Sequence, residues 1–224
     1  MTEVTAKAAK TNKKVGRTAS KEVRRRQLIE ATIESISKFG ISGTTMTTVT
    51  GFAGLSIGIV NFHFKNKDTL FEETLRFLAE EHRDQWRKSV KNAALTPEAK
   101  LLAIVDAHFH PNICNRKKLS VWFGFYGEAA YRASYRKLMT DIDEERWNVS
   151  TDLCRQIIQS GQYENINSED IANTLEGLYD GFCLNILIYP GDFSRSDAKK
   201  QVRDYLATVF PNHVNTSIQK PHKG

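Results

Sequence analysis

The stretch GISGTTMTTVTGFAGLSIGIVNFHFKNKDTLFEETL, residues 40–75, decides the fold, because two very short helical segments flank the sequence Ala-Gly-Leu-Ser at 53–56. Short helices are marginal by themselves, so each needs strong end signals and a core to pack on. Thr45 is the expected N-cap of the first helix, and Met46 and Val49 point that helix into a core. The pattern predicts two short helices joined by a tight turn.

The turn has its own signals. Gly54 supplies a positive φ that a side chain would resist, and Ser56 is the expected N-cap of a second helix running from Ile57 to about Phe64. A helix, a Gly-containing turn and a second helix form the arrangement that places the second helix in the major groove of DNA. Gly58 would let the backbone approach DNA closely.

Positive charge is concentrated at the N-terminal end of the 224-residue chain, whose net charge is +6. Residues 1–26 hold nine Lys or Arg and two Glu, so the remaining residues sum to about −1. Clustered cations bind polyanions by releasing counterions, although a solvated tail has the same composition. Residues 1–20 are polar without an amphipathic period, which predicts a flexible arm.

Apolar residues elsewhere recur at spacings of three and four, as they do on helix faces. Residues 21–39 form the first predicted helix, which ends at Gly40, and Asn66 caps a long helix with Leu70, Phe71, Leu75, Leu78 and Trp86 facing inward. Further helices are expected at 97–109, 116–130, 134–160, 168–189 and 194–210. Gly161 is the expected end of the helix at 134–160, and Ser194 and Asp197 are expected to form a capping box at the start of the helix at 194–210. No segment alternates with period two, so we predict an all-α fold of about nine helices.

Several classes of protein are excluded or disfavoured. Three widely spaced cysteines offer neither a disulfide framework nor a paired zinc signature, and no apolar run is long enough to cross a bilayer, so we expect a cytoplasmic protein without membrane contact. His108, His110 and Cys114 diverge on a helix and are not expected to bind metal. The segment 51–58 lacks the strand and the Lys-Ser/Thr ending of a phosphate loop. We therefore expect neither an enzyme nor a cofactor, and we interpret the acidic run Asp141, Asp143, Glu144 and Glu145 as a solvated helix face.

Residues 45–70 resemble the helix-turn-helix of the tetracycline-repressor (TetR) family. The family pattern places Thr at the first cap, Ala-Gly-hydrophobe-Ser at the turn, Gly two residues later, an aromatic-x-His-Phe sequence near the end of the third helix and a Lys opening the fourth. Thr50 stands where Ala is usual, and Asn61 replaces a common Tyr that touches phosphate. Asn61 is instead expected to reach a base, because an Asn amide pairs with N6 and N7 of adenine.

The resemblance and the helix-end chemistry together assign DNA-binding roles. Thr45, Thr47 and Lys67 are expected to hold phosphates, and Ser56, Ile57, Asn61 and Phe62 are candidates for base edges. Arm residues would add nonspecific or minor-groove contacts. The full predicted set is Thr45, Thr47, Ser56, Ile57, Gly58, Asn61, Phe62, His63, Lys67, Lys13, Lys14 and Arg17. The competing interpretation is a helical hairpin that packs on itself, with His63 structural and Phe62 and Phe64 in its core.

Residues 119–210 are more weakly similar to the repressors of choline-to-glycine-betaine genes, the BetI type. The similarity rests on the aromatic cluster at 122–126 followed by Gly-Glu-Ala, on Tyr131-Arg132 and on the sequence Leu-Tyr-Asp-Gly-Phe at 178–182. In that family the last two helices of each subunit form a four-helix dimer interface. The implied interface residues are Leu175, Leu178, Phe182, Ile186, Tyr205, Leu206 and Val209. A dimer also supplies two recognition helices for a pseudo-palindromic operator.

A choline-like effector needs an aromatic cage, because a quaternary ammonium has no hydrogen to donate and is held by ring faces. The candidates are Trp122, Phe125, Tyr126, Trp147 and Tyr179, with Glu128 and Asp180 as possible anions. Aromatic residues at helical spacing are also typical of an ordinary core.

Two functional hypotheses follow. The first is a homodimeric, effector-responsive repressor that binds double-stranded DNA, and the second is a nonspecific nucleic-acid-binding or interaction module that uses the basic arm. The expected organisation is a flexible arm at 1–20, a helix-turn-helix domain at 21–66, a helical effector-binding and dimerisation domain at 67–211 and a disordered tail at 212–224.

Overall fold

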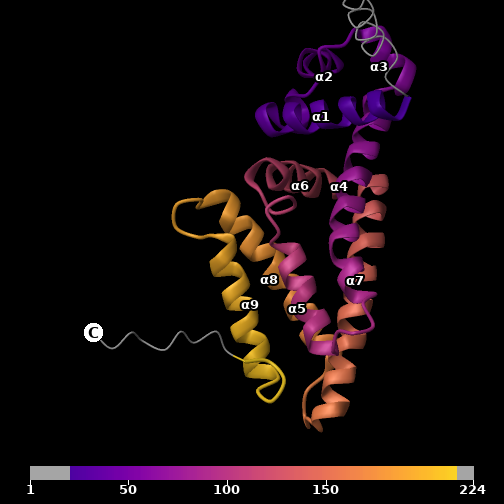
Figure 1. Cartoon of the computed structure of the whole chain (residues 1–224). Coiled ribbons are helices and arrows are strands. Elements are labelled where there is room, and N and C mark those ends of the chain that lie inside the picture. The colour runs from indigo at the N-terminus through magenta and orange to yellow at the C-terminus, as the bar shows by residue number, and fades with distance from the viewer. Residues whose placement is uncertain (1–20, 216–224) are drawn as a thin grey trace, which may run out of the picture. The chain divides into compact units, whose positions relative to one another are not determined.

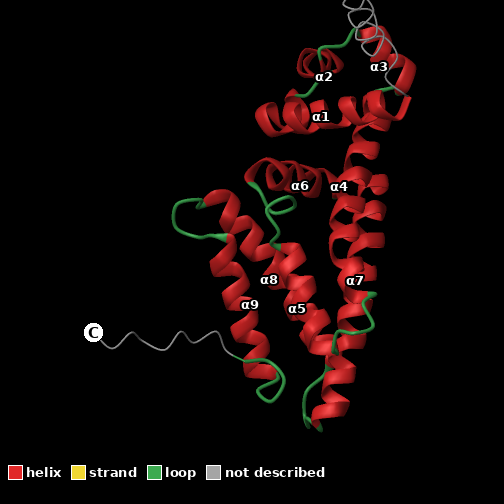
Figure 2. Ribbon diagram, in the orientation of Figure 1, coloured by secondary structure: helices red, strands yellow, loops and turns green. Residues whose placement is uncertain are grey.

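The computed structural model describes residues 21–215, which contain nine helices and no strand (Figures 1 and 2). The all-α prediction is thus confirmed for this part of the chain. The helices are α1 (Lys21–Gly43), α2 (Met46–Ala53), α3 (Ile57–His63), α4 (Lys67–Val90), α5 (Pro97–His108), α6 (Arg116–Ala129), α7 (Ala133–Gly161), α8 (Ser168–Ile188) and α9 (Arg195–Val209). They form two compact units that divide after Thr74, so α4 contributes its first two turns to one unit and the rest to the other.

The first unit packs α1 against α2 and α3. Gly40 interrupts α1 with a φ of 72°, as expected where the first regular helix ends. Before it, Ser35 hydrogen-bonds the hydroxyls of Thr44 and Thr48 at 3.1 and 2.7 Å, which fixes α2 on α1. Of the apolar side chains expected on the inner face, Leu28, Ile29, Ile33, Ile36 and Val49 are buried in this unit, as are Val60 of α3 and Phe64. Met46 is only half-buried and Phe39 is 45% exposed, so the prediction is wrong for Phe39.

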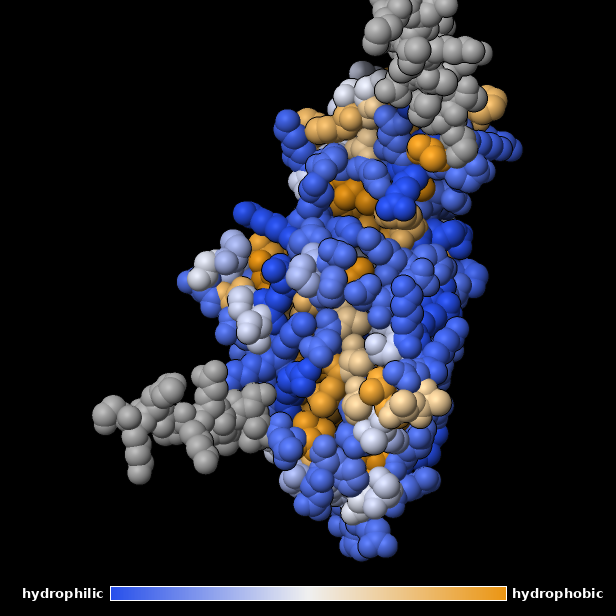
Figure 3. Space-filling model, viewed as in Figure 1, coloured by the Kyte–Doolittle hydropathy of each residue, from blue (hydrophilic) through white to orange (hydrophobic). Residues whose placement is uncertain are grey.

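The second unit is a helical bundle in which α7 packs on α5, α6 and α8, and α9 packs on α5 and α8. Trp86, Phe109, Tyr179 and Phe210 are its large, fully buried side chains that belong to one continuous core. Its surface on the side drawn in Figure 3 is mainly hydrophilic but is interrupted by apolar side chains. Within residues 21–215, none of the helices has the length and apolar character that a bilayer crossing demands.

Two predicted ends differ from the structure. Gly161 stays helical, and Gln162 takes the left-handed conformation that ends α7. Gly161 is required for another reason, because a Cβ there would collide with the ring of Tyr163. The tail was expected to be disordered from residue 212, yet Val214 is buried and the backbone N–H of Asn212 donates to the Tyr163 hydroxyl at 3.0 Å. Short ordered segments after a helix are difficult to foresee because their partners lie far away in sequence.

Candidate functional site

The α2–turn–α3 segment is built by reciprocal capping and one left-handed glycine. The N–H of Thr48 donates to Thr45 Oγ1 at 3.1 Å, and the N–H of Thr45 donates to Thr48 Oγ1 at 2.9 Å. Gly54 has a φ of 62° and closes α2, as the sequence predicts. Ser56 occupies the N-cap position of α3 but makes no side-chain capping bond, so its predicted capping interaction is wrong. Its hydroxyl is left for other contacts.

The outer face of α3 is apolar and exposed. Phe62 is 76% exposed and Ile57 is 48% exposed, whereas Val60 on the opposite face is buried. Ser56, Gly58 and Asn61 are also exposed, and α3 contains no acidic residue that would repel phosphate. The structure thus brings five of the predicted base-edge and backbone-contact residues to one accessible segment. The alternative interpretation is wrong for Phe62, whereas Phe64 is buried as it predicted.

Other predicted contacts are partly engaged within the unit. Lys67 is half-buried, with Nζ 3.4 Å from the carbonyl oxygen of Ile41 and 4.9 Å from the centre of the Phe71 ring. His63 is also half-buried, and its pKa is lowered by burial and by the neighbouring positive charge of Arg25. Thr45 and Thr47 are exposed, while Lys13, Lys14 and Arg17 lie outside the described residues.

Arg25 is a positioning residue that the sequence reasoning missed. Its guanidinium donates to the carbonyl of His63 at 2.9 Å, pairs with Glu73 at 2.9 Å and lies over the Phe64 ring at 4.6 Å. Gln27 on the same helix donates to the carbonyl of Ala53 at 2.7 Å. The C-terminal ends of α2 and α3 are therefore held by polar side chains of α1, which in the sequence look like part of a basic solvated face.

The second unit contains a cavity of about 50 Å³, several times what a single buried water needs. Of the predicted effector residues, Trp122, Tyr126 and Asp180 line it. The other lining residues were not predicted for this role: His82, His108, Ile113, Cys114, Leu119, Phe123, Ile142, Asp143, Arg146 and Cys183. Its small size suits a ligand of few atoms.

The charged groups at the cavity form one network around a buried arginine. Arg146 donates to Glu176 Oε1 and to Asp143 Oδ1, each at 2.9 Å. Burial raises the pKa of Asp143, and burial together with the nearby Asp143 raises the pKa of Asp180 to about 6. Tyr126 donates a hydrogen bond to Asp180. Three carboxyl groups face one guanidinium, so acidic groups outnumber the single cation of the network.

Two buried histidines add no positive charge to this network. Burial lowers the pKa of His82 to about 3 and that of His108 well below its usual value, so both rings are neutral. The rings meet edge to face with centroids 4.9 Å apart, and Tyr179 stacks on His108 at 4.4 Å. His82 Nε2 and His108 Nδ1 are buried without a hydrogen-bond partner. Unsatisfied buried nitrogens of this kind favour a polar guest in the cavity.

The remaining predicted effector residues lie elsewhere. Phe125 is buried against Tyr135, Glu128 pairs with Arg132, and Trp147 donates to the side chain of Asn173 at 2.8 Å. Tyr179 is fully buried behind His108 and does not line the cavity.

The acidic run on α7 is not a uniformly solvated face. Asp143 lines the cavity and Glu145 pairs with Arg83 and Arg87, which corrects the prediction for both. Two features of the sequence carried the missing signal. Arg146 follows Ile142 by four residues on the apolar stripe of α7, and His82 lies midway between Leu78 and Trp86 on that of α4. A polar residue at an apolar helical position marks a buried site.

The predicted dimer residues divide into two groups. Leu175, Ile186 and Leu206 are buried inside the subunit, so they have no surface to offer a partner. Leu178, Phe182, Tyr205 and Val209 are half-buried. The exposed side of α8 instead carries Gly177, Gly181, Leu184 and Ile188, with Leu184 40% and Ile188 54% exposed. This exposed side lies one step around the helix from the predicted stripe.

Comparisons with known proteins agree with both units. Residues 28–74 match the family described as bacterial regulatory proteins, tetR family, and residues 97–211 match the family described as BetI-type transcriptional repressor, C-terminal. The HTH-type transcriptional regulator BetI of Burkholderia thailandensis is 31% identical over 189 residues, which are 83% of this chain and 93% of that protein.

Solved structures show the same fold. A putative transcriptional regulator from Pseudomonas aeruginosa PAO1 has a TM-score of 0.77 at 22% identity, over 89% of this chain and 95% of that one. A putative transcriptional regulator from Saccharomonospora viridis in complex with choline has a TM-score of 0.75 at 18% identity, over 87% and 99% of the two chains. The predicted TetR-like fold is thereby confirmed.

Proposed function

The chain belongs to the TetR family of bacterial regulatory proteins and is a BetI-type transcriptional repressor with a helix-turn-helix for DNA, and from this premise we propose that a small organic cation of the choline type releases it from its operator. The family assigns regulation and not catalysis to the chain. The observation that carries the proposal is the cavity in which aromatic rings and surplus carboxylates face the same space.

The chemistry of the cavity supports a cation. A quaternary ammonium is held by ring faces and by nearby negative charge, and Trp122, Phe123 and Tyr126 lie beside Asp143 and Asp180. Arg146 carries one positive charge and shares it between Asp143 and Glu176, so it compensates only one of these two carboxylates. The choline complex of a protein with the same fold supports the same class of ligand.

We propose that the repressor acts as a homodimer through the exposed side of α8 together with Tyr205 and Val209 of α9. Leu184 and Ile188 expose apolar area that a partner would remove from water. Gly177 and Gly181 each lower helix stability by about 1 kcal/mol relative to Ala, and a Cβ on either would meet nothing within the subunit. Glycines at such positions let a second helix approach closely.

Effector binding would change the distance between the two recognition helices of the dimer, so that they no longer fit successive major grooves. Helix α4 is the proposed link, since it carries His82 at the cavity and its first two turns belong to the DNA-binding unit. A ligand can shift the equilibrium only by its difference in affinity between the two states.

The test is fluorescence anisotropy with a duplex taken from the promoter next to the gene, in excess competitor DNA. We expect specific binding that choline reverses, and we expect Asp143→Asn to keep DNA binding while losing the response to choline. Deleting residues 1–20 should weaken but not abolish binding. Loss of all binding on that deletion, without preference over competitor, would instead support the nonspecific module.

A further inference from the structure

Two of the cysteines lie side by side at the wall of the cavity. Cys114, at the end of the α5–α6 loop, and Cys183, on α8, have Sγ atoms 3.9 Å apart, and both side chains line the cavity. Their separation along the chain is 69 residues, so the fold and not local sequence brings them together. Cys154 is also buried but does not line the cavity. The chain thus provides a thiol pair and a built-in control.

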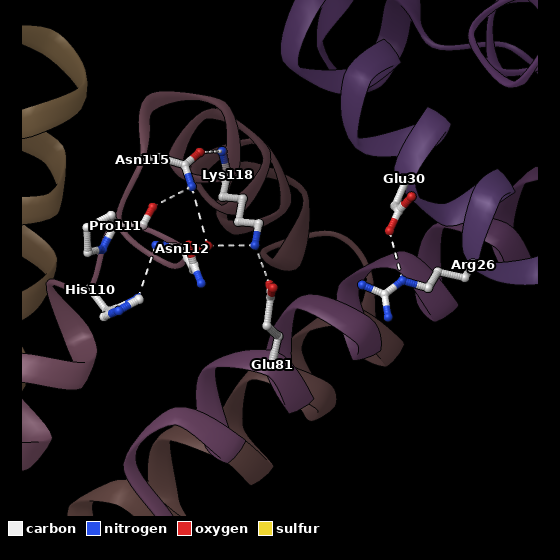
Figure 4. A network of polar contacts seen from close by, with 8 residues as sticks. All are labelled: Arg26, Glu30, Glu81, His110, Pro111, Asn112, Asn115 and Lys118. Carbon is white, nitrogen blue, oxygen red and sulfur yellow. Dashed lines mark hydrogen bonds and ion pairs between the residues drawn. The ribbon is translucent and has the colours of Figure 1, made fainter. Parts of the chain in front are cut away.

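The loop that carries Cys114 is held in place by polar contacts (Figure 4). Asn115 caps α6 and its amide donates to the carbonyl oxygens of Pro111 and Asn112 at 3.0 and 3.3 Å. Lys118 links the Asn112 carbonyl to Glu81 of α4, and Arg195 donates to the Cys114 carbonyl at 3.3 Å. The position of the Cys114 thiol is therefore set by α4, α6 and α9 together.

The two thiols are not equivalent in reactivity. A hydrogen bond from Cys183 lowers the pKa of Cys114, and the positive charges of Arg195 and Lys199 lower it further against the effect of burial. The same hydrogen bond and burial raise the pKa of Cys183. A thiolate is the form that attacks an oxidant, so Cys114 is the nucleophile of the pair and Cys183 is the resolving thiol. Burial alone raises the pKa of Cys154 to about 12, which makes that thiol inert.

We propose that Cys114 and Cys183 are an oxidation-sensitive pair that a small hydroperoxide converts to a disulfide across the cavity wall. The cavity admits hydrogen peroxide, which needs about the space of two water molecules. The sulfur of Cys114 attacks one peroxide oxygen, the O–O bond breaks, and the other oxygen leaves as water after taking a proton. Cys114 is then a sulfenic acid.

In the second step the sulfur of Cys183 attacks the sulfur of Cys114. The S–S bond forms, the S–O bond breaks, and the departing hydroxide takes the Cys183 proton and leaves as water. The two thiols have then lost two electrons and two protons, and hydrogen peroxide has taken both and has been reduced to two water molecules. The reaction needs the sulfurs to approach from 3.9 Å to about 2.05 Å.

The disulfide would draw the start of α6 towards α8 and narrow the cavity between them. This consequence rests on the proposed function, because it concerns the effector. Formation of the bond does not rest on it and is measured separately.

The first experiment treats the full-length protein with hydrogen peroxide and then identifies the oxidised residues by peptide mass spectrometry. We expect a Cys114–Cys183 cross-linked pair that has lost two hydrogen atoms and returns to thiols with dithiothreitol. Cys154 should remain a free thiol that alkylates only after unfolding. Free Cys114 and Cys183, or oxidation of Cys154 at the same rate, would overturn the proposal.

The second experiment uses Cys183→Ser, with Cys154→Ser as the matched control. Without its resolving thiol, Cys114 should accumulate as a sulfenic acid that dimedone labels, whereas the control should still form the disulfide. Absence of dimedone labelling in folded Cys183→Ser, verified by its thermal melt, would refute the assignment of Cys114 as nucleophile.

The third experiment measures stabilisation by choline before and after oxidation. Loss of the choline shift in the melting temperature after oxidation, with recovery on reduction, is the expected result. A disulfide that forms while the choline shift stays the same would refute the effect on the cavity. If reduced protein shows no choline shift at all, the effector proposal fails and the disulfide result stands.

Discussion

At the scale of single residues, the electrostatic character of the cavity depends on which of its carboxyl groups are paired with Arg146. Arg146 is buried and saturated by Asp143 and Glu176, so Asp180 has no cation of its own. The Asp180 side chain is exposed on one side and lines the cavity on the other, and partial burial together with its neighbours Asp143, Arg146, Glu176 and Tyr126 sets its pKa. Its carboxyl group therefore changes charge near pH 6.

Choline affinity should rise as pH increases through about 6, because Asp180 becomes ionised there. Isothermal titration calorimetry between pH 5 and 8 measures this, and Asp180→Asn should bind more weakly and lose the dependence. In the absence of ligand, folding stability changes with pH in the opposite direction to choline affinity. The pKa of Asp180 is raised above 3.8 in the folded protein, so its protonation contributes fully to stability below pH 3.8, and this contribution is lost as the pH rises through 6. Equal choline affinity at pH 5 and pH 7.5 would contradict the role given to Asp180.

Phe62 should contribute to operator affinity and not to folding. Its side chain is 76% exposed, so Phe62→Ala should change the free energy of unfolding by less than about 0.5 kcal/mol. The same change should weaken operator binding by about 1–3 kcal/mol without altering the salt dependence. Anisotropy titrations at several salt concentrations measure both quantities. Phe52→Ala, on α2, is the control, and equal losses for both variants would mean that α3 has no special contact.

At the scale of helices and turns, Thr45 and Ser56 make a matched pair. Thr45 forms a capping box, whereas Ser56 holds the same position on α3 without a side-chain bond. Thr45→Ala should lower the free energy of unfolding by about 1 kcal/mol, and Ser56→Ala should change it little. Urea denaturation followed by circular dichroism compares them. A larger loss in Ser56→Ala than in Thr45→Ala would show that the hydroxyl roles are assigned the wrong way round.

The sequence predicted those parts of the fold that depend on local signals. Helix periods, the Gly54 turn, and the caps at Thr45, Asn66 and Ser194 are decided within a few residues, and the structure contains all of them. The predicted end of α7 was wrong because Gly161 is required for its close contact with the Tyr163 ring and not for a left-handed backbone conformation.

The cavity was predicted only in part for the same physical reason. Trp122, Tyr126 and Asp180 belong to resemblance motifs, whereas His82, Asp143 and Arg146 come from two helices that tertiary packing brings together. Arg25 was missed because an arginine in a basic run gives no local sign of its distant partners, the His63 carbonyl and Glu73.

At the scale of the whole molecule, dimerisation is the property most open to test. Leu184→Glu combined with Ile188→Glu should yield monomers in size-exclusion chromatography with light scattering, because charges would be buried against a close helix. Tyr131→Glu, at a site between α6 and α7 that is 88% exposed, should leave the dimer intact. Operator affinity should fall with the double variant, since one monomer offers one recognition helix. An unchanged molecular mass would place the interface elsewhere.

The excess of carboxyl groups around Arg146 affects which small molecules the regulator can distinguish. Oxidising the alcohol of a quaternary amino alcohol to an acid leaves the ammonium group untouched but adds a carboxylate, which makes a zwitterion. Asp143 and Asp180 would attract the first compound and repel the new anionic end of the second. We therefore expect the regulator to tell precursor from product by net charge alone, so that its signal ends as the precursor is consumed.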